Sequence, residues 1–443
     1  MTTPVRRAAV FAILATLSLA VPLFGPAVGA TLAAIVLVGA FVLTDGPLFD
    51  LLAYPSDYED GRLYGLLTFV LAAVVLGLIA VTASLSIAVF VGTVLLIGYG
   101  NLGERLARLR TDTEVVVVTT FCLVATLAAT AGQLATFWLT GTAIEPLLPT
   151  VLFLAASGTL FAALLRDVLL LYDDPIVMLS VGFLLWLLVE LQPAIGAGEI
   201  AIALAVTVAL GYASFALGTA SIAGMLTGVL LGLVTIVLGG YGWFVVLIAF
   251  FAIGGLSTKY RYERKEELGV AEANDGARGS GNVLGNAAVA LVAVLGYAAS
   301  SAALLPADPN PALFLFAFAG SVATAMSDTL SSEIGSVFER PRLITTLEPV
   351  KPGTDGGVTW QGEVAGIAGG AIVALISYVL FPEVDAVGAA IIAAAGFVGM
   401  TVDSLLGATL EGSVLGNQGV NFLATLLGAI VCALLVFSVG VLG

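Results

Sequence analysis

The chain is 443 residues long, and 60% of its residues are apolar while only 10% are charged. This composition excludes a soluble globular protein, in which about a quarter of the residues carry a charge. The apolar residues suffice for about 13 membrane spans of about 20 residues each. The 52 glycines also fit the composition of membrane helices.

The sequence contains no histidine and two cysteines, Cys122 and Cys432. The lack of histidine excludes Ser/His/Asp and Cys/His nucleophilic sites and all histidine-ligated metal sites, and two cysteines cannot form a structural zinc site. Both cysteines lie in apolar runs, so we expect them to be small buried side chains. Any chemistry must therefore use carboxylates, lysine, arginine, amides, hydroxyls or the backbone.

The formal net charge is −15, and only three of the fifteen basic residues are lysines. A surface that is acidic and poor in lysine suits a high-salt cytoplasm, where ions screen the repulsion. This favours a halophilic archaeon over the alternative of an ordinary acidic protein. In neither case does the charge favour a nucleic acid as a partner.

Long uncharged stretches occur along the whole chain and predict membrane helices. Dividing the longest at clusters of Gly, Pro and Ser gives about fourteen or fifteen helices, which predicts an all-α, polytopic integral membrane protein of the cell membrane. The first stretch follows Arg6 and Arg7 but lacks a convincing signal-peptide cleavage site, so we expect it to be the first span. The stretches run from 8 to 44, 63 to 103, 115 to 144, 146 to 165, 175 to 189, 200 to 258, 279 to 307, 309 to 327, 364 to 382, 386 to 402 and 412 to the end.

Three polar connections are rich in basic residues, and the positive-inside rule places all three in the cytoplasm. Arg166, at the end of another stretch, is expected to extend to the membrane surface, because it and Asp167 point in different helix directions. The basic connections are marked by Arg105, Arg108 and Arg110, by Lys259, Arg261, Arg264, Lys265 and Arg278, and by Arg340, Arg342 and Lys351.

The chain changes character near residue 195. Before this point the loops are chemically plain, and after it polar residues enter the predicted helices in regular stripes. We therefore predict a membrane domain of uncertain role over residues 1–195 and a functional domain over residues 196–443. No clear internal repeat is visible.

The first polar stripe consists of Arg278, Asn282 and Asn286, which recur every four residues and share one helix face. Glycines at positions 279 and 281 leave amide N–H groups accessible at the start of this helix. These amides, the helix dipole and the arginine together favour an anion such as phosphate. The alternative is a helix cap beside a cytoplasmic arginine.

The second stripe lies in the span that begins at Pro311, and it places Asp328 deep in the membrane or near its inner surface. An acid at such a position is costly without a partner and indicates a functional site. Glu333 lies about 140° farther around an ideal helix, so the two acids share a site only if the helix ends or unwinds between them. A solvated helix end is the alternative for Glu333.

Asp403 is the third acid of interest. Gly399 and Gly407 lie one turn to either side of it and would let another helix or a ligand approach its carboxylate. Asn417 and Asn421 continue the polar character toward the last span. With the two acids of the preceding stripe, Asp403 offers the oxygen ligands that Mg²⁺ prefers, and we predict these three acids as the metal-binding and catalytic residues. An interhelical hydrogen bond is the alternative for Asp403.

The loop over residues 340–357 combines basic residues, glycines, hydroxyls and an acid. Its glycine amides could surround phosphate oxygens while the basic side chains neutralise them. It contains no Walker A motif, because no Gly-Lys-Ser/Thr follows the glycines, and a flexible turn is the alternative. The residues of this loop that we predict to bind phosphate are Arg342, Lys351, Gly353, Thr354, Asp355, Gly356 and Gly357.

Several motifs in the second half of the chain occur together in one known family. They are Ser-Asp-Thr-Leu-Ser-Ser-Glu-Ile-Gly at 327–335, Pro-Arg-Leu-Ile-Thr-Thr at 341–346, Pro-Gly-Thr-Asp-Gly-Gly-Val at 352–358 and Asp-Ser-Leu-Leu-Gly-Ala at 403–408, with Asn417, Asn421, Thr258-Lys259 and Arg278-Gly279. From about residue 200 to its end the chain resembles the integral membrane family called domain of unknown function 92. That family includes transmembrane protein 19 and the plant phytyl-phosphate kinase of tocopherol synthesis.

The resemblance implies a membrane phosphotransferase that acts on a phytyl- or geranylgeranyl-type monophosphate. It implies a nucleoside triphosphate as co-substrate, with CTP suspected from a distant kinship to polyprenol kinases. The Mg²⁺ cofactor is predicted from the three acids described above. The lipid tail would lie in the bilayer and the phosphates at the cytoplasmic face. The residues implied in binding the phosphates and the nucleotide are Arg278, Asn282, Asn286, Arg342, Lys351, Asn417, Asn421 and the 353–357 loop.

Two other functions remain open at this point. A secondary transporter also combines many helices with buried acids, and inverted repeats would favour it. A membrane protein that binds lipid without turnover would tolerate the loss of Asp328 and Asp403.

Overall fold

The computed structural model of the chain describes residues 3–168, 174–270, 278–306 and 309–441. Within these ranges the regular structure is helical apart from two short strands, β1 (Arg342–Leu343) and β2 (Gly357–Val358), which pair antiparallel. The predicted fold class is confirmed: the protein is an all-α, polytopic membrane protein.

Thirteen helices in the described part of the chain are long and apolar enough to cross a membrane, against the predicted fourteen or fifteen. The first uncharged stretch accounts for part of the difference, since it forms one full-length span, Pro4–Phe24, followed by the shorter helix α3 (Pro26–Val42). Gly25, with φ of +89°, and Pro26 in the first turn of α3 separate the two helices. Such a break needs a backbone conformation that glycine adopts at little cost.

The chain divides into two compact units, Met1–Ile202 and Ala203–Gly443, hereafter the N-terminal and C-terminal units. The change of character near residue 195 lies just before this division. The N-terminal unit contains α1 (Thr3–Thr16), η1 (Leu17–Leu19), α2 (Ala20–Phe24), α3, α4 (Pro47–Leu52), α5 (Asp57–Asp60), α6 (Tyr64–Thr82), α7 (Ile87–Ala107), α8 (Glu114–Leu139), η2 (Glu145–Leu147), α9 (Leu148–Val168), α10 (Asp174–Glu190) and the start of α11 (Ala197–Ala216).

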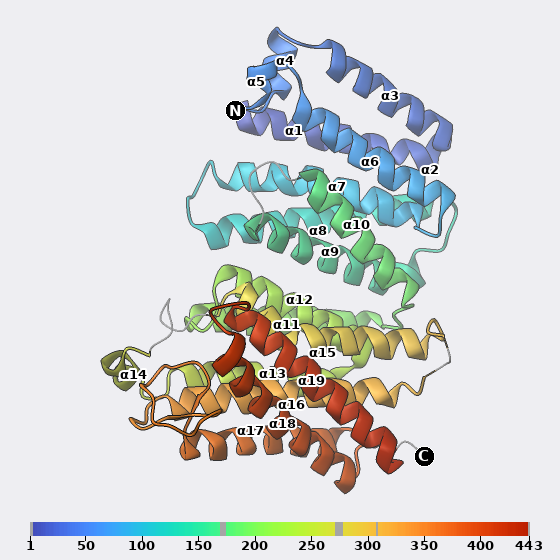
Figure 1. The fold of residues 1–443 in the computed structure, drawn as a ribbon. Coiled ribbons are helices and arrows are strands. Elements are labelled where there is room, and N and C mark those ends of the chain that lie inside the picture. The colour runs from blue at the N-terminus through green and yellow to red at the C-terminus, as the bar shows by residue number, and fades with distance from the viewer. Residues whose placement is uncertain (1–2, 169–173, 271–277, 307–308, 442–443) are drawn as a thin grey trace. The chain divides into compact units, whose positions relative to one another are not determined.

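Helix α7 lies at the centre of the N-terminal unit, in contact with α1, α6, α8, α9 and α10 (Figure 1). The Ser86 hydroxyl caps its start by accepting from the Ala88 N–H at 3.2 Å. Every residue from Ala88 to Gly98 is buried, as expected for a helix that is apolar all round. A Cβ at Gly98 would lie 2.7 Å from the Cβ of Ala15, so glycine is needed for the close approach of α1.

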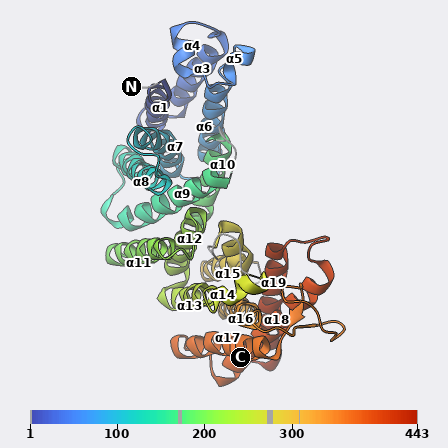
Figure 2. The same ribbon diagram turned by 90° about the vertical axis from the view of Figure 1, so that its left-hand side faces the viewer.

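The C-terminal unit is built around α16 (Ala312–Gly335), which contacts α13, α15, α17, α18 and α19 (Figures 1 and 2). Every residue from Phe318 to Ser327 is buried. A Cβ at Gly399 or at Gly428 would lie 2.2 or 2.0 Å from the Thr324 hydroxyl oxygen, so α18 and α19 approach α16 through glycines. The other helices of this unit are α12 (Ile222–Gly239), α13 (Tyr241–Thr258), α14 (Tyr262–Leu268), α15 (Ser280–Ser301), α17 (Trp360–Leu380), α18 (Ala386–Leu410) and α19 (Asn417–Val439).

Candidate functional site

Two carboxyl groups from different helices of the C-terminal unit meet at the candidate site. Asp328 of α16 and Asp403 of α18 lie within hydrogen-bond reach of each other, and both side chains are half-buried. Neither forms an ion pair with a Lys or Arg of the described ranges. Two adjacent carboxylates in a partly desolvated place repel each other, so the pair requires a proton or a cation to neutralise it.

Asparagine side chains from two further helices complete the surroundings of Asp403. The Asn421 amide can be oriented so that both its nitrogen and its oxygen form hydrogen bonds. In this orientation the nitrogen donates to Asp403 Oδ1 at 3.3 Å and to Asn417 Oδ1 at 3.1 Å. The Asn421 oxygen then accepts from Asn286 Nδ2 at 3.2 Å. Asn286 also donates to the backbone oxygen of Asn282 at 2.9 Å. The structure therefore brings together the predicted polar residues of α15, α18 and α19.

Glycines near the start of α15 allow this convergence. A Cβ at Gly281 would lie 2.6 Å from the Gln418 side-chain nitrogen, and a Cβ at Gly285 would lie 3.1 Å from the Gln418 backbone oxygen. Any larger residue at these positions would separate the start of α15 from the start of α19. Gln418 is a residue that the sequence analysis missed, because its importance depends on which helix faces it.

Arg278 lies at the entrance to α15 and is buried, with 8% exposure. Its backbone is fixed by two hydrogen bonds, one from its N–H to the Thr219 oxygen and one from the Ser221 N–H to its own oxygen, both at 3.0 Å. Its guanidinium carbon lies 5.5 Å from the centre of the Phe250 ring. The charge of Arg278 also acts on Asp328, which is consistent with a shared site.

The 340–357 loop docks onto the end of α18 through Gly356. This residue has φ of +73°, and a Cβ there would lie 2.6 Å from the Ser404 oxygen and 2.4 Å from the Ala408 Cβ. The Ile344 N–H donates to the Gly356 oxygen at 3.0 Å, which joins the β1–β2 hairpin to this contact. A Cβ at Gly407, one turn after Asp403 on the same face of α18, would lie 3.1 Å from the Gly356 nitrogen, so the glycine part of the loop lies on the side of α18 that carries Asp403.

The predicted phosphate-binding residues of the loop differ in their contacts. Arg342 donates to the Leu347 oxygen at 2.7 Å, so its guanidinium holds the loop itself. Lys351 is exposed, and its backbone oxygen accepts from the Thr354 hydroxyl at 2.8 Å. Gly353 adopts φ of +79°, while Gly357 donates its N–H to the Thr354 oxygen at 2.9 Å. The loop is therefore an ordered turn, and Arg340 and Lys351 are its two exposed basic side chains without a partner among the described residues.

Glu411 adds a further acid just beyond α18. Burial and the nearby Asp355 carboxylate raise the pKa of Glu411 above its ordinary value. Glu411 also acts electrostatically on Asp328 and Asp403. The region around the two aspartates is therefore strongly anionic, and a bound cation would be attracted to it.

Glu333 pairs with a lysine of another helix and is not grouped with Asp328. Helix α16 runs unbroken to Gly335, so the condition for Glu333 to share a helix face with Asp328 is not met. Glu333 instead forms a buried ion pair with Lys265 of α14, whose ammonium group also donates to the Thr258 oxygen at 3.1 Å. In the described part of the chain no three acidic or cysteine side chains are grouped to hold a metal. A metal role for Glu333 therefore stays a prediction that this geometry does not favour.

Comparisons with known proteins agree with the sequence resemblance. The family model described as integral membrane protein DUF92 matches residues 205–429. An uncharacterized membrane protein of Methanocaldococcus jannaschii is 34% identical over 218 residues, which are 48% of this chain and 84% of that protein. The chloroplastic protein VTE6 and the protein PGR, both of Arabidopsis thaliana, are 32% and 30% identical over 48% and 42% of this chain, and over 65% and 79% of their own lengths. No solved structure matches. The chain belongs to the integral membrane protein family DUF92.

Proposed function

We propose that the C-terminal unit is a membrane isoprenyl-phosphate kinase. A phosphate oxygen of a phytyl- or geranylgeranyl-type monophosphate attacks the terminal phosphorus of a nucleoside triphosphate, CTP being the suspected donor. The bond from that phosphorus to its bridging oxygen breaks, and the products are the isoprenyl diphosphate and a nucleoside diphosphate. The facing carboxyl groups of Asp328 and Asp403 are the observation that carries the proposal, together with the family's resemblance to phytyl-phosphate kinase.

The donor set fits a magnesium ion. Two facing carboxyl groups without an ion-pair partner, supported by the Asn421 amide, present the oxygen ligands that Mg²⁺ prefers. Asp328 and Asp403 would hold the ion, and Glu411 would add negative charge nearby. A bound Mg²⁺ would neutralise phosphate charge and orient the transferring group.

The basic and amide groups around the acids would bind the phosphates. Arg278 is buried beside Asp328 and carries the fixed positive charge of the site. Lys351 is exposed on the docked loop and could reach a nucleotide that binds from outside. Asn286 and Asn421 offer neutral hydrogen bonds that would orient phosphate oxygens. Phosphoryl transfer depends mainly on such positioning and charge neutralisation, so the absence of histidine is no obstacle.

A small cavity beside Arg278 suits the lipid part of the acceptor. It has a volume of about 80 Å³ and is lined by α11, α12 and α13 with Arg278 and Val283. Apolar and small residues such as Leu210, Gly228 and Phe251 form most of its walls. Its volume could hold only the part of a prenyl chain next to the phosphate, with the remainder of the chain in the bilayer. The positive-inside rule, applied to the basic connections, supports a site at the cytoplasmic face of the cell membrane.

The proposal is tested by assaying the purified full chain with phytyl or geranylgeranyl phosphate, Mg²⁺ and each nucleoside triphosphate in low and high salt. Thin-layer chromatography of labelled products would measure isoprenyl diphosphate. We expect Asp328→Asn and Asp403→Asn each to lower the rate roughly 100-fold or more, because removal of one preorganised electrostatic group typically costs that much. Glu383→Gln, which changes an exposed acid before α18, is the matched control and should retain the wild-type rate.

The absence of diphosphate with every nucleotide and both prenyl chains would reject the kinase. Full activity in both aspartate variants would reject the aspartate pair as its site. Ion-driven uptake into liposomes without turnover would instead identify a transporter. Binding of prenyl phosphate without turnover, unchanged by Asp328→Asn and Asp403→Asn, would identify a lipid-binding protein.

A further inference from the structure

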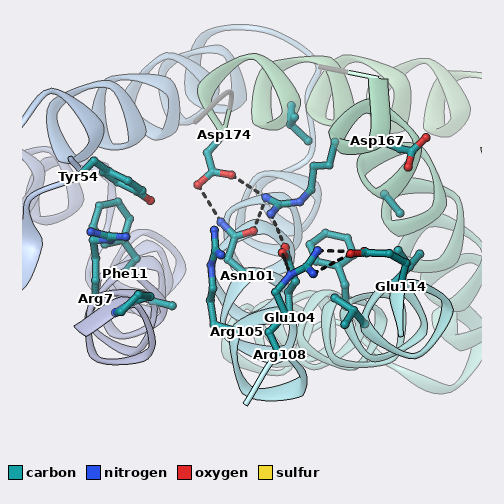
Figure 3. Close-up of a pocket in the computed structure, with 18 residues that line it drawn as sticks. Arg7, Phe11, Tyr54, Asn101, Glu104, Arg105, Arg108, Glu114, Asp167 and Asp174 are labelled. Carbon is teal, nitrogen blue, oxygen red and sulfur yellow. Dashed lines mark hydrogen bonds and ion pairs between the residues drawn. The ribbon is translucent and has the colours of Figure 1, made fainter. Parts of the chain in front are cut away.

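A polar cavity of about 310 Å³ lies within the N-terminal unit, apart from any residue of the proposed kinase site (Figure 3). It is formed at one end of a helix group, by the first turns of α1, α8 and α10 and the last turns of α7 and α9, with Tyr54 from the segment after α4. Four of the chain's arginines line it, although the chain as a whole carries a net charge of −15. These arginines are Arg7, Arg105, Arg108 and Arg166.

Two of the arginines are fully engaged with acids on the wall of the cavity. Arg166 forms ion pairs with Glu104 and with Asp174, the latter at 2.9 Å, and Asn101 donates to the same Asp174 carboxylate at 2.8 Å. Arg108 pairs with Glu104 at 3.1 Å and with Glu114 at 2.9 Å. Figure 3 shows this connected network on one side of the cavity. It fixes the wall, and it gives each of its three acids an arginine partner.

Arg7 and Arg105 lie outside this network. The lining as a whole has four arginines and four acids, and the fourth acid, Asp167, is exposed and lies across the network from Arg7 in Figure 3. Arg7 and Arg105 are both half-buried, and neither forms an ion pair within the described ranges. Arg7 donates one hydrogen bond to the Ala53 oxygen at 2.5 Å and lies 4.0 Å from the centre of the Tyr54 ring. A guanidinium has five N–H donors, so most of those on Arg7 and Arg105 are available to a ligand.

The remaining walls of the cavity indicate the kind of ligand. Figure 3 places Arg7 and Tyr54 on one side of the cavity and Arg105 with Asn101 on the other. Burial, together with the Asp174 carboxylate, raises the pKa of Tyr54 to about 12, so its hydroxyl is protonated at neutral pH. Apolar side chains, among them Phe11, line the rest. Converging guanidiniums with apolar walls suit a phosphate group attached to an apolar body.

We propose that this cavity is a second anion site, which binds a phosphate group between Arg7 and Arg105. The phosphate belongs either to the headgroup of an anionic lipid or to a free phosphate. Arg105 and Arg108 belong to a connection predicted to be cytoplasmic, so lipid of the inner leaflet and solutes of the cytoplasm would both reach the cavity. The site is independent of the proposed kinase activity.

Binding is measured on the full chain in nanodiscs of uncharged lipid, by isothermal calorimetry with three probes. The probes are dihexanoyl phosphatidic acid, inorganic phosphate and dihexanoyl glycerol, which lacks the phosphate. We expect phosphatidic acid to bind and the uncharged glycerol not to bind. Binding of inorganic phosphate with similar affinity would assign the site to free phosphate, whereas much weaker binding would assign it to a lipid headgroup.

Four arginine variants provide matched comparisons. Arg7→Gln and Arg105→Gln should each weaken binding of the phosphate probe by about tenfold or more, since each removes charge-assisted hydrogen bonds. Arg6→Gln and Arg110→Gln change exposed neighbours that do not line the cavity, and they should bind as the wild type does. Equal binding by all four variants, or equal binding of phosphatidic acid and the uncharged glycerol, would overturn the site. Circular dichroism of each variant checks that a loss of binding is not a loss of folding.

Discussion

The two units neutralise acids at their helix ends in different ways. In the N-terminal unit the Arg166 guanidinium forms ion pairs with both Glu104 and Asp174. The counterion of each acid is therefore a side chain of the protein itself. In the C-terminal unit the carboxyl groups of Asp328 and Asp403 face each other, with amides beside them. In the first arrangement each acid has a basic side chain as its partner, whereas the second requires a mobile cation or a proton. Such a difference is expected between a framework contact and the proposed site for chemistry.

The C-terminal unit also contains a fixed ion pair, which makes the contrast sharper. Glu333 pairs with Lys265, and both side chains are buried. The unit therefore neutralises this acid with a lysine of another helix. A buried pair of this kind binds helix to helix, and breaking it leaves a charge without a partner.

The largest expected effect comes from breaking the fixed network of the N-terminal unit. Arg166→Met should lower the free energy of unfolding by about 3–5 kcal/mol, because Glu104 and Asp174 would lose their shared counterion in a mostly buried place. The exposed fractions of the two acid side chains are 12% and 13%. Thermal unfolding of the purified chain, followed by circular dichroism, would measure the change.

Glu114→Gln is the control for this prediction. Glu114 is 56% exposed and its partner Arg108 is 38% exposed, so solvent screens the pair and its loss should cost about 0–1 kcal/mol. Equal destabilisation by the two variants would mean that the contribution of these ion pairs to stability does not depend on their burial. A triple variant, Arg166→Met with Glu104→Gln and Asp174→Asn, should recover most of the lost stability.

Much of the fold could be predicted from the sequence because a bilayer permits few alternatives. Each span needs about 20 apolar residues in a helix, and the uncharged stretches meet that need. The length of α3 could not be read from apolar composition alone, since it depends on the local break at Gly25 and Pro26. Such breaks depend on backbone angles rather than on hydrophobicity.

The site could be predicted in part for a similar reason. A charge inside an apolar helix stands out in the sequence, and this singled out Asp328 and Asp403 before any coordinates. The partner of Glu333 could not be found in this way, because Lys265 is 68 residues distant in the chain and lies on a different helix. The same holds for Arg166 and Glu104, which are separated by 62 residues. Sequence spacing predicts which residues share a face of one helix, but it does not predict which helices contact each other.

The next largest effect concerns a cation at the aspartate pair. If Asp328 and Asp403 hold Mg²⁺, free Mg²⁺ at a hundredfold excess over its Kd should stabilise the chain by about 2.7 kcal/mol, and chelation should remove this gain. Asp403→Asn should lose the response and, in metal-free buffer, should be no less stable than the wild type, because one of two repelling charges is gone. Differential scanning fluorimetry with and without Mg²⁺ would measure both.

Glu333→Gln separates a metal role for Glu333 from its ion pair. This variant should be destabilised, since Lys265 loses its counterion, yet it should keep the full Mg²⁺ response. A lost Mg²⁺ response in Glu333→Gln would instead restore Glu333 to the metal site. An unchanged response in Asp403→Asn would argue against the aspartate pair as the binding place.

The smallest expected effect tests whether the docked loop belongs to the site. Gly356→Ala and Gly440→Ala both place a Cβ on a residue with φ of +73°, which should cost about 1–2 kcal/mol in each case. Only at Gly356 would the new Cβ also meet the Ser404 oxygen and the Ala408 Cβ, whereas nothing lies within 4 Å at Gly440. The further loss of stability at Gly356 should therefore be about 1–3 kcal/mol, the usual range for overpacking.

Activity should distinguish the two glycine variants more clearly than stability does. Displacement of the loop from α18 would move its amides and Lys351 away from the Asp403 carboxylate, so the apparent KM for the nucleotide should rise in Gly356→Ala and stay unchanged in Gly440→Ala. The comparison uses the same backbone strain in both variants, so only the contact with α18 differs between them. If both variants keep the wild-type KM, the loop packs against the site without taking part in it, and the nucleotide must be bound by Arg278 and the asparagines alone.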